Sequence, residues 1–294
     1  MDSTNALGEY LRARREQVRP EDVGLRRVGL RRVPGLRREE VAMLAGISSD
    51  YYLRLEQGRD RHPSVQVLEA LADVLRLDAD ATAYLVGLVQ EQPRAVPKRQ
   101  RPRTEPVPES IRELIDGWPN NPAYVQNKYT DVLAVNALGA ALTPNYAVGV
   151  NLLTAVLLDP AEQALRRDWD ELTEEGVAVL RSELGSAVDD PRLVELVGEL
   201  SVRSERFRQL WARHDVRPRR GRLSLLTHPD VGDLELKSDK LTIGGTDGMT
   251  LVVFHAVPGS RSVESLALLG SLVASSDKID ETTEQRDQTP RPSD

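Results

Sequence analysis

A proline-rich segment divides this chain and limits how it can fold. Residues 92–108 read QPRAVPKRQRPRTEPVP, with five prolines and no aromatic residue. Proline removes a backbone donor and favours extended conformations, so we expect a semi-rigid linker here. At 294 residues the chain is also too long for one ordinary core. We therefore expect two folded units, residues 1–91 and 109–274, and a disordered polar tail at residues 275–294.

The two parts of the chain differ in charge. Residues 1–105 hold 19 Lys and Arg against 16 Asp and Glu, whereas residues 106–294 hold 20 against 30. Because residues 1–105 are mildly basic and the rest of the chain is acidic, a nucleic-acid partner is favoured for the first unit only. The chain has no cysteine, which excludes disulfides, thiolate metal sites and cysteine nucleophiles.

The sequence predicts neither a signal peptide nor a membrane span. Its first residues, MDSTNALGEYLRARR, contain no apolar run of the kind that secretion requires. The uncharged stretch at residues 132–158 is interrupted by Asn136, by Thr-Pro-Asn at 143–145 and by Asn151. These polar residues favour a buried strand and helix over a membrane helix. We expect a cytoplasmic protein.

Apolar residues recur at helical spacing five times in the first unit, which predicts a compact all-α bundle of five short helices. The stripes are Leu7/Tyr10/Leu11, Val41/Leu44/Ala45, Tyr52/Leu55, Val67/Leu68/Leu71/Leu75 and Tyr84/Leu85/Leu88. Ser64, which follows the helix-breaking Pro63, is placed to cap the fourth helix.

The most informative block is residues 36–58, LRREEVAMLAGISSDYYLRLEQG. A short apolar helix ends at Ala45, and Gly46 stands where a left-handed turn residue is needed. Ile47 then fills the core, and Ser48 is placed to cap the next helix. A glycine turn of this kind lets two helices meet steeply, so that the second enters the DNA major groove.

The block resembles the helix-turn-helix of Xre-type and lambda-repressor-type proteins at Val41-Ala42, Gly46 and Glu56-Gln57-Gly58. The resemblance implies that the second helix is a recognition helix for double-stranded DNA. Its exposed start then presents four residues to base edges, with Arg54 suited to guanine and Asp50 to cytosine. The four are Ser49, Asp50, Tyr51 and Arg54.

Residues around the recognition helix are expected to contact DNA phosphates. They are Arg37, Arg38, Ser48, Arg59, Arg61 and His62; the alternative for each is an ordinary solvated side chain. The long loop at residues 19–35 departs from the compact repressor pattern. Its arginines at 26, 27, 31 and 32 (Arg26, Arg27, Arg31 and Arg32) either follow the DNA backbone or enter the minor groove, or the loop is a mobile insertion.

The second unit reads as α+β. Residues 124–126 and 132–135 resemble paired strands after a Pro/Asn turn, and three more strands are expected between Leu223 and Val257. Helical segments are expected between them, at about 151–158, 161–185, 190–201 and 204–214. Strands, a helical middle and further strands predict one antiparallel sheet with helices on one side.

Several phrases, among them LAVNALGAAL, NLLTAVLLDP, DWDELTEEGVAVLRSE and THPDVGDLEL, resemble the ligand-binding domain of MmyB-like regulators. This family, abundant in actinobacteria, joins an Xre-type helix-turn-helix to a PAS-like sensory domain. The resemblance spans residues 7–259 in order. It implies a transcription factor whose PAS-like pocket holds a small apolar effector of the fatty-acid type, with no cofactor required.

Dimers of this helix-turn-helix class contact half-sites about 34–36 Å apart, so we expect a homodimer on a near-palindromic operator. Residues expected near the effector combine rings with a few polar groups: Trp118, Tyr124, Asn136, Asn151, Phe207, Trp211, His214 and Phe254. Phe207, Leu210, Trp211 and His214 share one helix face by their spacing. That face is equally compatible with simple core, and the two asparagines with helix caps or strand-end hydrogen bonds.

The sequence argues against an enzyme. His214-Asp215 and His228-Pro229-Asp230 place an imidazole beside a carboxylate, but neighbours on a helix point in different directions. The chain has no Gly-x-Ser-x-Gly elbow, and the glycines at 244–248 resemble a hairpin loop rather than a phosphate-binding loop. The alternative to an effector-controlled regulator is a constitutive DNA-binding regulator whose C-terminal unit only dimerises or binds a protein partner.

Overall fold

The computed structural model describes residues 5–25, 35–60, 62–89, 106–184 and 190–287. Contacts divide the chain into two compact units. The first joins Met1–Pro102 to Thr173–Pro218, and the second joins Arg103–Leu172 to Arg219–Asp294. Most of the expected linker lies outside the described residues. The grouping of residues 173–218 with the N-terminal helices was not indicated by the sequence.

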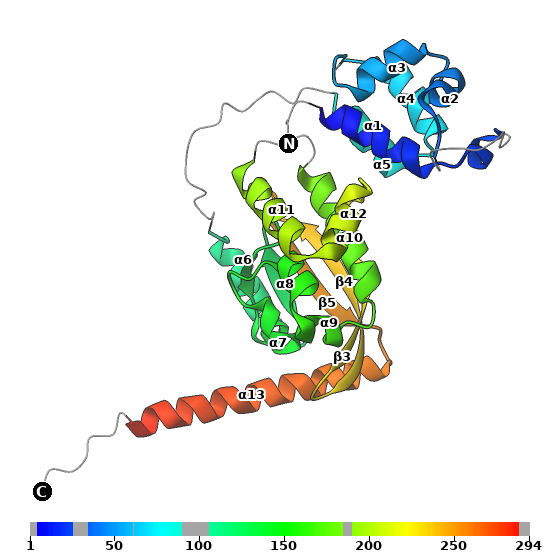
Figure 1. Ribbon diagram of the computed structural model, residues 1–294. Helices are drawn as coiled ribbons and strands as arrows, with labels where there is room; N and C mark the ends of the chain where they lie inside the picture. Colours follow the sequence, from blue (N-terminus) through cyan, green and yellow to red (C-terminus); the bar gives the residue numbers. More distant parts are fainter. Residues whose placement is uncertain (1–4, 26–34, 61, 90–105, 185–189, 288–294) are drawn as a thin grey trace, which may run out of the picture. The chain divides into compact units, whose positions relative to one another are not determined.

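Five α-helices form the N-terminal part of the first unit, as the sequence predicted (Figure 1). They are α1 (Ala6–Gln17), α2 (Arg38–Leu44), α3 (Ser49–Glu56), α4 (Val65–Val74) and α5 (Ala79–Gly87), with a 3-10 turn η1 (Pro20–Val23) after α1. Ser64 and Asp78 cap α4 and α5 by accepting hydrogen bonds from the Val67 and Ala81 amides. Tyr10, Leu11, Tyr52 and Leu55 are buried in their common core.

Gly8 lets α1 approach the end of α3 closely. A Cβ added at Gly8 would lie 2.3 Å from the Glu56 carbonyl oxygen and 2.2 Å from Asn5 Oδ1. Both distances are shorter than real Cβ atoms show. The Glu56 oxygen belongs to the backbone, so it cannot move aside by a side-chain rotation. The absence of a side chain at Gly8, in the first turn of α1, is therefore the condition for this packing, despite the low helix propensity of glycine.

Three further helices belong to the first unit: most of α10 (Trp169–Leu184), α11 (Pro191–Arg203) and α12 (Glu205–Ala212). Asp190 and Ser204 cap α11 and α12. The helix expected over 161–185 is divided, because α9 (Pro160–Leu165) ends before α10 begins. The last helix ends at Ala212, and His214 lies beyond it with a left-handed φ of 54°, so His214 is not on the helical face that its spacing suggested.

The second unit contains a five-stranded antiparallel sheet in the order β2-β1-β5-β4-β3, as expected (Figure 1). The strands are β1 (Ala123–Gln126), β2 (Val132–Val135), β3 (Arg222–His228), β4 (Gly232–Thr242) and β5 (Thr250–Ala256). The glycine-rich residues 244–248 form the hairpin loop between β4 and β5, as the sequence indicated.

Helices cover both faces of the sheet, so the prediction of helices on one side is wrong. Tyr124, Val252 and Phe254 pack with α7 (Ala137–Leu142), α9 and α13 (Arg261–Asp287). Val125 and Leu251 point to the opposite face, where α6 (Glu109–Asp116) packs. Because β1 and β5 carry apolar residues at consecutive positions, both of their faces must be shielded from water.

The uncharged stretch at residues 132–158 folds as a strand and short helices, as the sequence favoured. It comprises β2, α7, a 3-10 turn η2 (Pro144–Tyr146) and α8 (Leu152–Leu158). Within the described part of the chain, no helix has the length and apolar character needed to cross a membrane.

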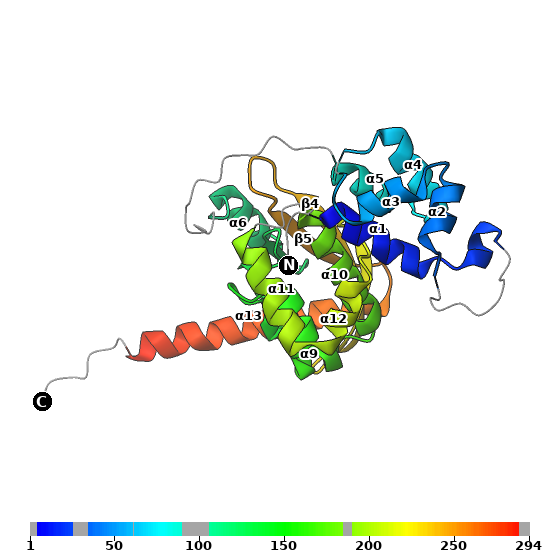
Figure 2. The same ribbon diagram turned by 45° about the horizontal axis from the view of Figure 1, so that its top comes forward.

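The expectation of a disordered tail from residue 275 is wrong for residues 275–287, because α13 continues to Asp287. Ser262, Ser265, Leu266 and Leu269 are buried on the sheet, and the helix then extends away from it (Figures 1 and 2). The packed turns supply the costly helix nucleus, and each added residue then gains one hydrogen bond. Residues 288–294 lie outside the described residues.

The Gly8 contact predicts opposite effects of one substitution at two helical glycines. Gly8→Ala should lower the free energy of unfolding by about 1–3 kcal/mol, because the new methyl group overpacks α1 against α3. Gly198→Ala, at an exposed position in α11 with no atom near the added Cβ, should instead raise it by about 0.5–1 kcal/mol. Denaturant unfolding followed by circular dichroism measures both, and stabilisation by Gly8→Ala would contradict the close approach.

Candidate DNA-binding surface and effector domain

The turn between α2 and α3 has the geometry that the sequence predicted. Gly46 has φ +69°, a conformation that side chains rarely adopt, and Ile47 packs against the core of the unit. The Ser48 hydroxyl accepts a hydrogen bond from the Tyr51 amide at 3.1 Å and so caps α3. Tyr52 and Leu55 face inward and are fully buried. The turn, the cap and the two buried residues together leave the opposite side of α3 facing solvent.

The first turn of α3 is exposed. Ser48, Ser49, Asp50 and Arg54 all lie at the surface. Tyr51 is half-buried against the core, with the Arg54 guanidinium 5.6 Å from its ring centroid. Tyr51 is therefore partly occupied in supporting Arg54, by a cation–π contact, rather than standing free on the surface.

The expected phosphate contacts surround this turn. Arg37 and Arg38 stand at the start of α2 and Arg59 and His62 follow α3, and all four are exposed. Arg61 and the loop arginines at 26, 27, 31 and 32 lie outside the described residues. Exposed basic residues therefore lie both at the start of α2 and directly after α3.

Sequence reasoning missed the ion cluster beneath α3. The Glu56 side chain is 2% exposed; its Oε1 accepts from Arg15 Nε of α1, and its Oε2 from Arg38 Nε of α2, both at 2.6 Å. Burial lowers the pKa of Arg15, but the hydrogen bond and charge of Glu56 outweigh it, so that pKa is raised. The signal was available: Glu56 follows the buried Tyr52 by four residues, so it lies on the inner face of α3.

This cluster joins three helices through one carboxylate. Arg15 also donates to the Leu36 carbonyl at 2.9 Å, which fixes the chain just before α2. Arg38, whose side chain remains 45% exposed, is held by Glu56 while it faces solvent. Since the pairs are charge-assisted and Glu56 is shielded from water, they orient α3 on α1 and α2.

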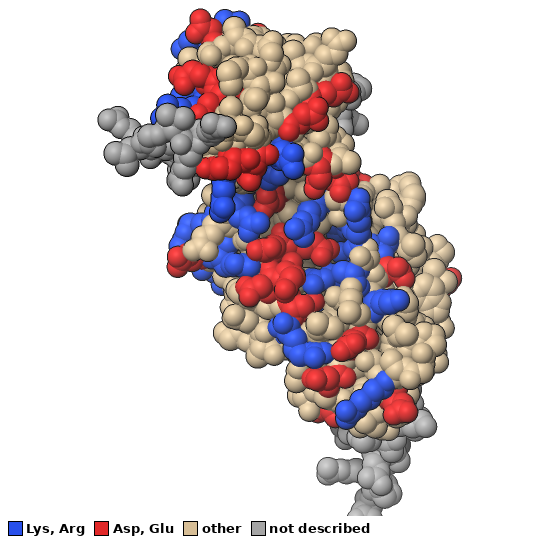
Figure 3. Space-filling view, turned by 90° about the vertical axis from the view of Figure 1, so that its right-hand side faces the viewer, with Lys and Arg blue, Asp and Glu red and all other residues tan. Residues whose placement is uncertain are grey.

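Basic and acidic side chains are mixed on the protein surface. On the face shown in Figure 3, arginines and lysines alternate with carboxylates and form no continuous basic field, in keeping with the net charge of −7. Asp50 and Glu39 are themselves exposed near the recognition turn. On the face shown, individual arginines rather than a large basic field are available to attract anions.

The described residues that were expected near an effector form several separate groups. Tyr124 and Phe254 lie 6.0 Å apart by ring centroid, and both contact Tyr146, which the sequence reasoning did not select. Trp118 packs on the opposite face of the sheet with α6. Phe207, Trp211 and His214 belong to the other unit, where Phe207 and Trp211 stack at 5.4 Å.

The two asparagines have structural partners. Asn151 caps α8, and its amide group donates to Tyr129 O and Asp131 Oδ1. The Asn136 Oδ1 accepts from the Ala123 and Gly139 amides, and its Nδ2 lies within hydrogen-bond distance of three carbonyl oxygens. Both asparagines therefore serve as helix caps and bond main-chain groups near strand ends, which was the alternative to a role in effector binding.

A buried polar group borders the ring cluster of Tyr124, Tyr146 and Phe254. Arg166 Nε donates to Glu162 Oε1 at 2.7 Å, and Arg166 Nη2 donates to the Tyr146 hydroxyl at 3.0 Å. Thr143 donates to the second Glu162 oxygen at 2.6 Å. Burial raises the pKa of Tyr146, so its phenol stays protonated at neutral pH. The buried rings therefore lie next to Arg166, which is ion-paired with Glu162, and next to the Tyr146 hydroxyl.

The histidines weighed as catalytic bases are held by other groups. Both ring nitrogens of His228 lie near main-chain atoms, the Ala141 carbonyl at 2.9 Å and the Asp230 amide at 3.2 Å. His214 Nδ1 lies 3.2 Å from Arg181 Nη1. Among the described residues, no group of three or more His, Cys, Asp or Glu is arranged to hold a metal ion.

An N-terminal helix-turn-helix joined to a sheet domain with an apolar, partly polar interior defines a DNA-binding regulator with a ligand-binding domain. Residues 6–85 match the family described as helix-turn-helix domain. Residues 107–269, more than half of the chain, match the MmyB-like transcription regulator ligand binding domain. The chain therefore belongs to the MmyB-like transcription regulators. No curated protein matches it.

The buried Glu56 cluster predicts a large effect of a small change. Glu56→Gln should lower the free energy of unfolding by about 3–5 kcal/mol, because it leaves the buried Arg15 without its counter-charge. Arg12→Ala removes an exposed pair with Glu16 on the same helix α1 and should cost less than about 1 kcal/mol. Denaturant unfolding compares them, and similar losses would show that Glu56 does not anchor α3.

Proposed function

We propose that the protein is a homodimeric, cytoplasmic transcription regulator that binds a near-palindromic operator and whose operator affinity is set by a small hydrophobic effector. The observation that carries this proposal is the exposed first turn of α3, held from beneath by Glu56 and flanked by unburied arginines. The matched families are a helix-turn-helix domain and a transcription regulator ligand-binding domain, which supports a regulatory role. No cofactor is needed for such a function.

At the DNA, Arg54 reads a guanine and Asp50 accepts from a cytosine, while Ser49 and Tyr51 contact neighbouring base edges. Arg54 stands one turn into α3, and its cation–π contact with Tyr51 limits its rotamers and so lowers the entropy lost on binding. The cations beside α3 contact phosphates and fix the register of the helix in the groove. Two such heads, about 34–36 Å apart, require a palindromic site.

The effector site that we propose lies at the ring cluster of Tyr124, Tyr146 and Phe254. Its rings offer an apolar surface of the kind that acyl chains bind, and centroids 4.6–6.0 Å apart place them in mutual contact. A fatty-acid carboxylate then meets the Tyr146 hydroxyl, which can donate its hydrogen while it accepts from Arg166. Because the rings already touch, entry of an effector must separate them, which gives the domain two states.

The division into base and phosphate contacts predicts two different arginine phenotypes. Arg54→Ala should weaken binding to the best operator by about 1–3 kcal/mol and relax the preference at one base pair. Arg59→Ala should weaken binding to all sequences evenly and reduce the salt dependence. The test is selection of duplexes from a random pool by the full-length chain, followed by affinity titrations at several salt concentrations. Identical behaviour of the two variants would contradict the assignment.

The effector proposal predicts a bound lipid in the purified protein. Native mass spectrometry of the full-length chain should show a mass excess that resolves into a fatty acid after denaturation, and a dimer. Tyr146→Phe should retain less of it because the hydroxyl contact is lost, whereas Trp118→Phe, on the opposite face of the sheet, should retain as much as the wild type. A wild type free of ligand would favour the constitutive regulator instead.

A further inference from the structure

The chain segment that follows α12 is held against α1, the first helix of the helix-turn-helix bundle. Both belong to the first unit. Arg14 Nη1 lies 2.7 Å from Asp215 Oδ1, and the Gln17 side chain donates to the Arg213 carbonyl at 2.6 Å. Val216 is 6% exposed and lies in the apolar core of α1, α3 and α4. A charge contact, a main-chain contact and an apolar contact therefore coincide within four residues.

Asp215 is the centre of this attachment. Its second oxygen lies 2.7 Å from Arg213 Nε, so that one carboxylate bridges a cation of α1 and a cation of its own segment. The side chains of Arg14 and Asp215 are only 19% and 27% exposed, which limits screening of their pair by water and salt. The pair is therefore stronger than an ordinary surface ion pair.

The turn that presents Asp215 is conformationally unusual. His214 adopts a left-handed φ of 54° without being glycine, a conformation that persists only where its surroundings hold it. Arg181 of α10 does so: it contacts His214 Nδ1, donates to the Trp211 carbonyl at 2.6 Å and lies 3.8 Å from the Trp211 ring centroid. Burial, together with Arg181 and Arg14, lowers the pKa of His214 to about 3, so its ring is a neutral acceptor.

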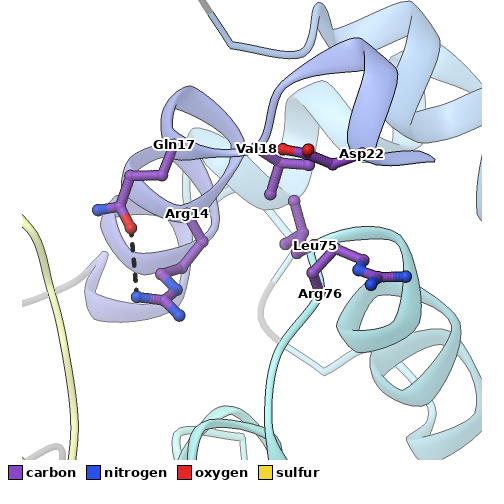
Figure 4. Close-up of a pocket in the computed structure, with 6 residues that line it drawn as sticks. All are labelled: Arg14, Gln17, Val18, Asp22, Leu75 and Arg76. Atoms are coloured by element: carbon purple, nitrogen blue, oxygen red, sulfur yellow. Dashed lines mark hydrogen bonds between the residues drawn. The ribbon is translucent and has the colours of Figure 1, made fainter. Parts of the chain in front are cut away.

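The attachment site on α1 adjoins open space. A cleft of about 310 Å³ is lined by Arg14, Gln17, Val18, Asp22, Leu75 and Arg76 (Figure 4). Arg14 and Gln17, which hold the segment, form one wall of this cleft. Close packing on all sides would lock the segment in place, whereas an incompletely filled site allows it to move at lower cost.

We propose that docking of the Arg213–Val216 segment on α1 couples the C-terminal domain to the recognition helix. The route is short: Arg14 holds the segment, and the adjacent Arg15 holds Glu56 at the end of α3. A shift of α1 is thereby passed to α3 through a buried ion pair. The segment leads directly into β3 of the sheet domain, so a change of state there reaches α1 through covalent chain. This inference rests on the proposed function.

Cross-linking tests whether the segment docks in solution, independently of DNA. The native chain has no cysteine, so introduced pairs report without background. Arg14→Cys with Asp215→Cys should be joined rapidly by a short bis-maleimide. Arg12→Cys with Asp215→Cys is the matched control, because Arg12 lies two residues away on the opposite side of α1 and is exposed. Equal or absent cross-linking of the two pairs overturns the docking.

Affinity measurements test the coupling on operator duplexes selected by the wild-type full-length chain. Asp215→Asn should change the operator Kd by about 5-fold or more, within the usual range of allosteric coupling. Arg14→Ala should do the same and the double variant no more, because both remove one contact. Glu199→Gln, which removes an exposed pair in α11, should leave the Kd unchanged.

The outcomes separate the two hypotheses. If the wild type selects no sequence, the proposed function fails. If it selects an operator and Asp215→Asn binds it within 2-fold of the wild type, the function stands and the coupling fails. Additive effects of Arg14→Ala and Asp215→Asn would show that the two residues act independently, which also overturns the coupling.

Discussion

The DNA-binding end of this protein depends on one buried carboxylate. Glu56 ends the recognition helix and pairs with an arginine from each of the two helices that support it. A buried charge without a partner is costly, so separating either supporting helix from Glu56 would be unfavourable. The glycine at position 8 makes this possible, since any side chain there would separate α1 from α3. Orientation of the exposed turn therefore follows from charge pairing beneath it.

The sheet domain is organised by a comparable but uncharged centre. Asn136, 4% exposed, bonds main-chain groups of the α6–β1 connection, β1 and α7 through one amide side chain. It thereby fixes the edge of the sheet where β1 and β2 meet the covering helices. Buried amides need all of their partners, and the protein supplies them from backbone. The ring cluster of Tyr124, Tyr146 and Phe254 is packed mainly by ring contacts, with one hydrogen bond from Arg166 to the Tyr146 hydroxyl.

Helix α1 lies between the Glu56 cluster and the segment after α12. Helix α1 carries Arg14 on one side and Arg15 on another, so a single helix contacts both the segment leading to the sheet domain and the base of α3. In a regulator, such an element needs to be stable in two positions rather than rigid in one. The left-handed His214 and the cleft beside Arg14 are both consistent with that requirement.

The sequence by itself determined the local structure. Helical periodicity located α1 to α5, Gly46 and Ser48 defined the turn before α3, and short apolar runs between turn residues indicated the five strands. These features depend on interactions between residues a few positions apart, so the spacing of residue types in the sequence is enough to predict them. Sequence reasoning did not find Glu56–Arg15 or Arg14–Asp215, whose partners lie 41 and 201 residues apart. It also grouped Phe207 and Trp211 with Tyr124 as effector residues; contacts assign the first two to one compact unit and Tyr124 to the other. Only the tertiary structure decides which distant charges and rings meet, because burial, not spacing, sets the free energy of those contacts.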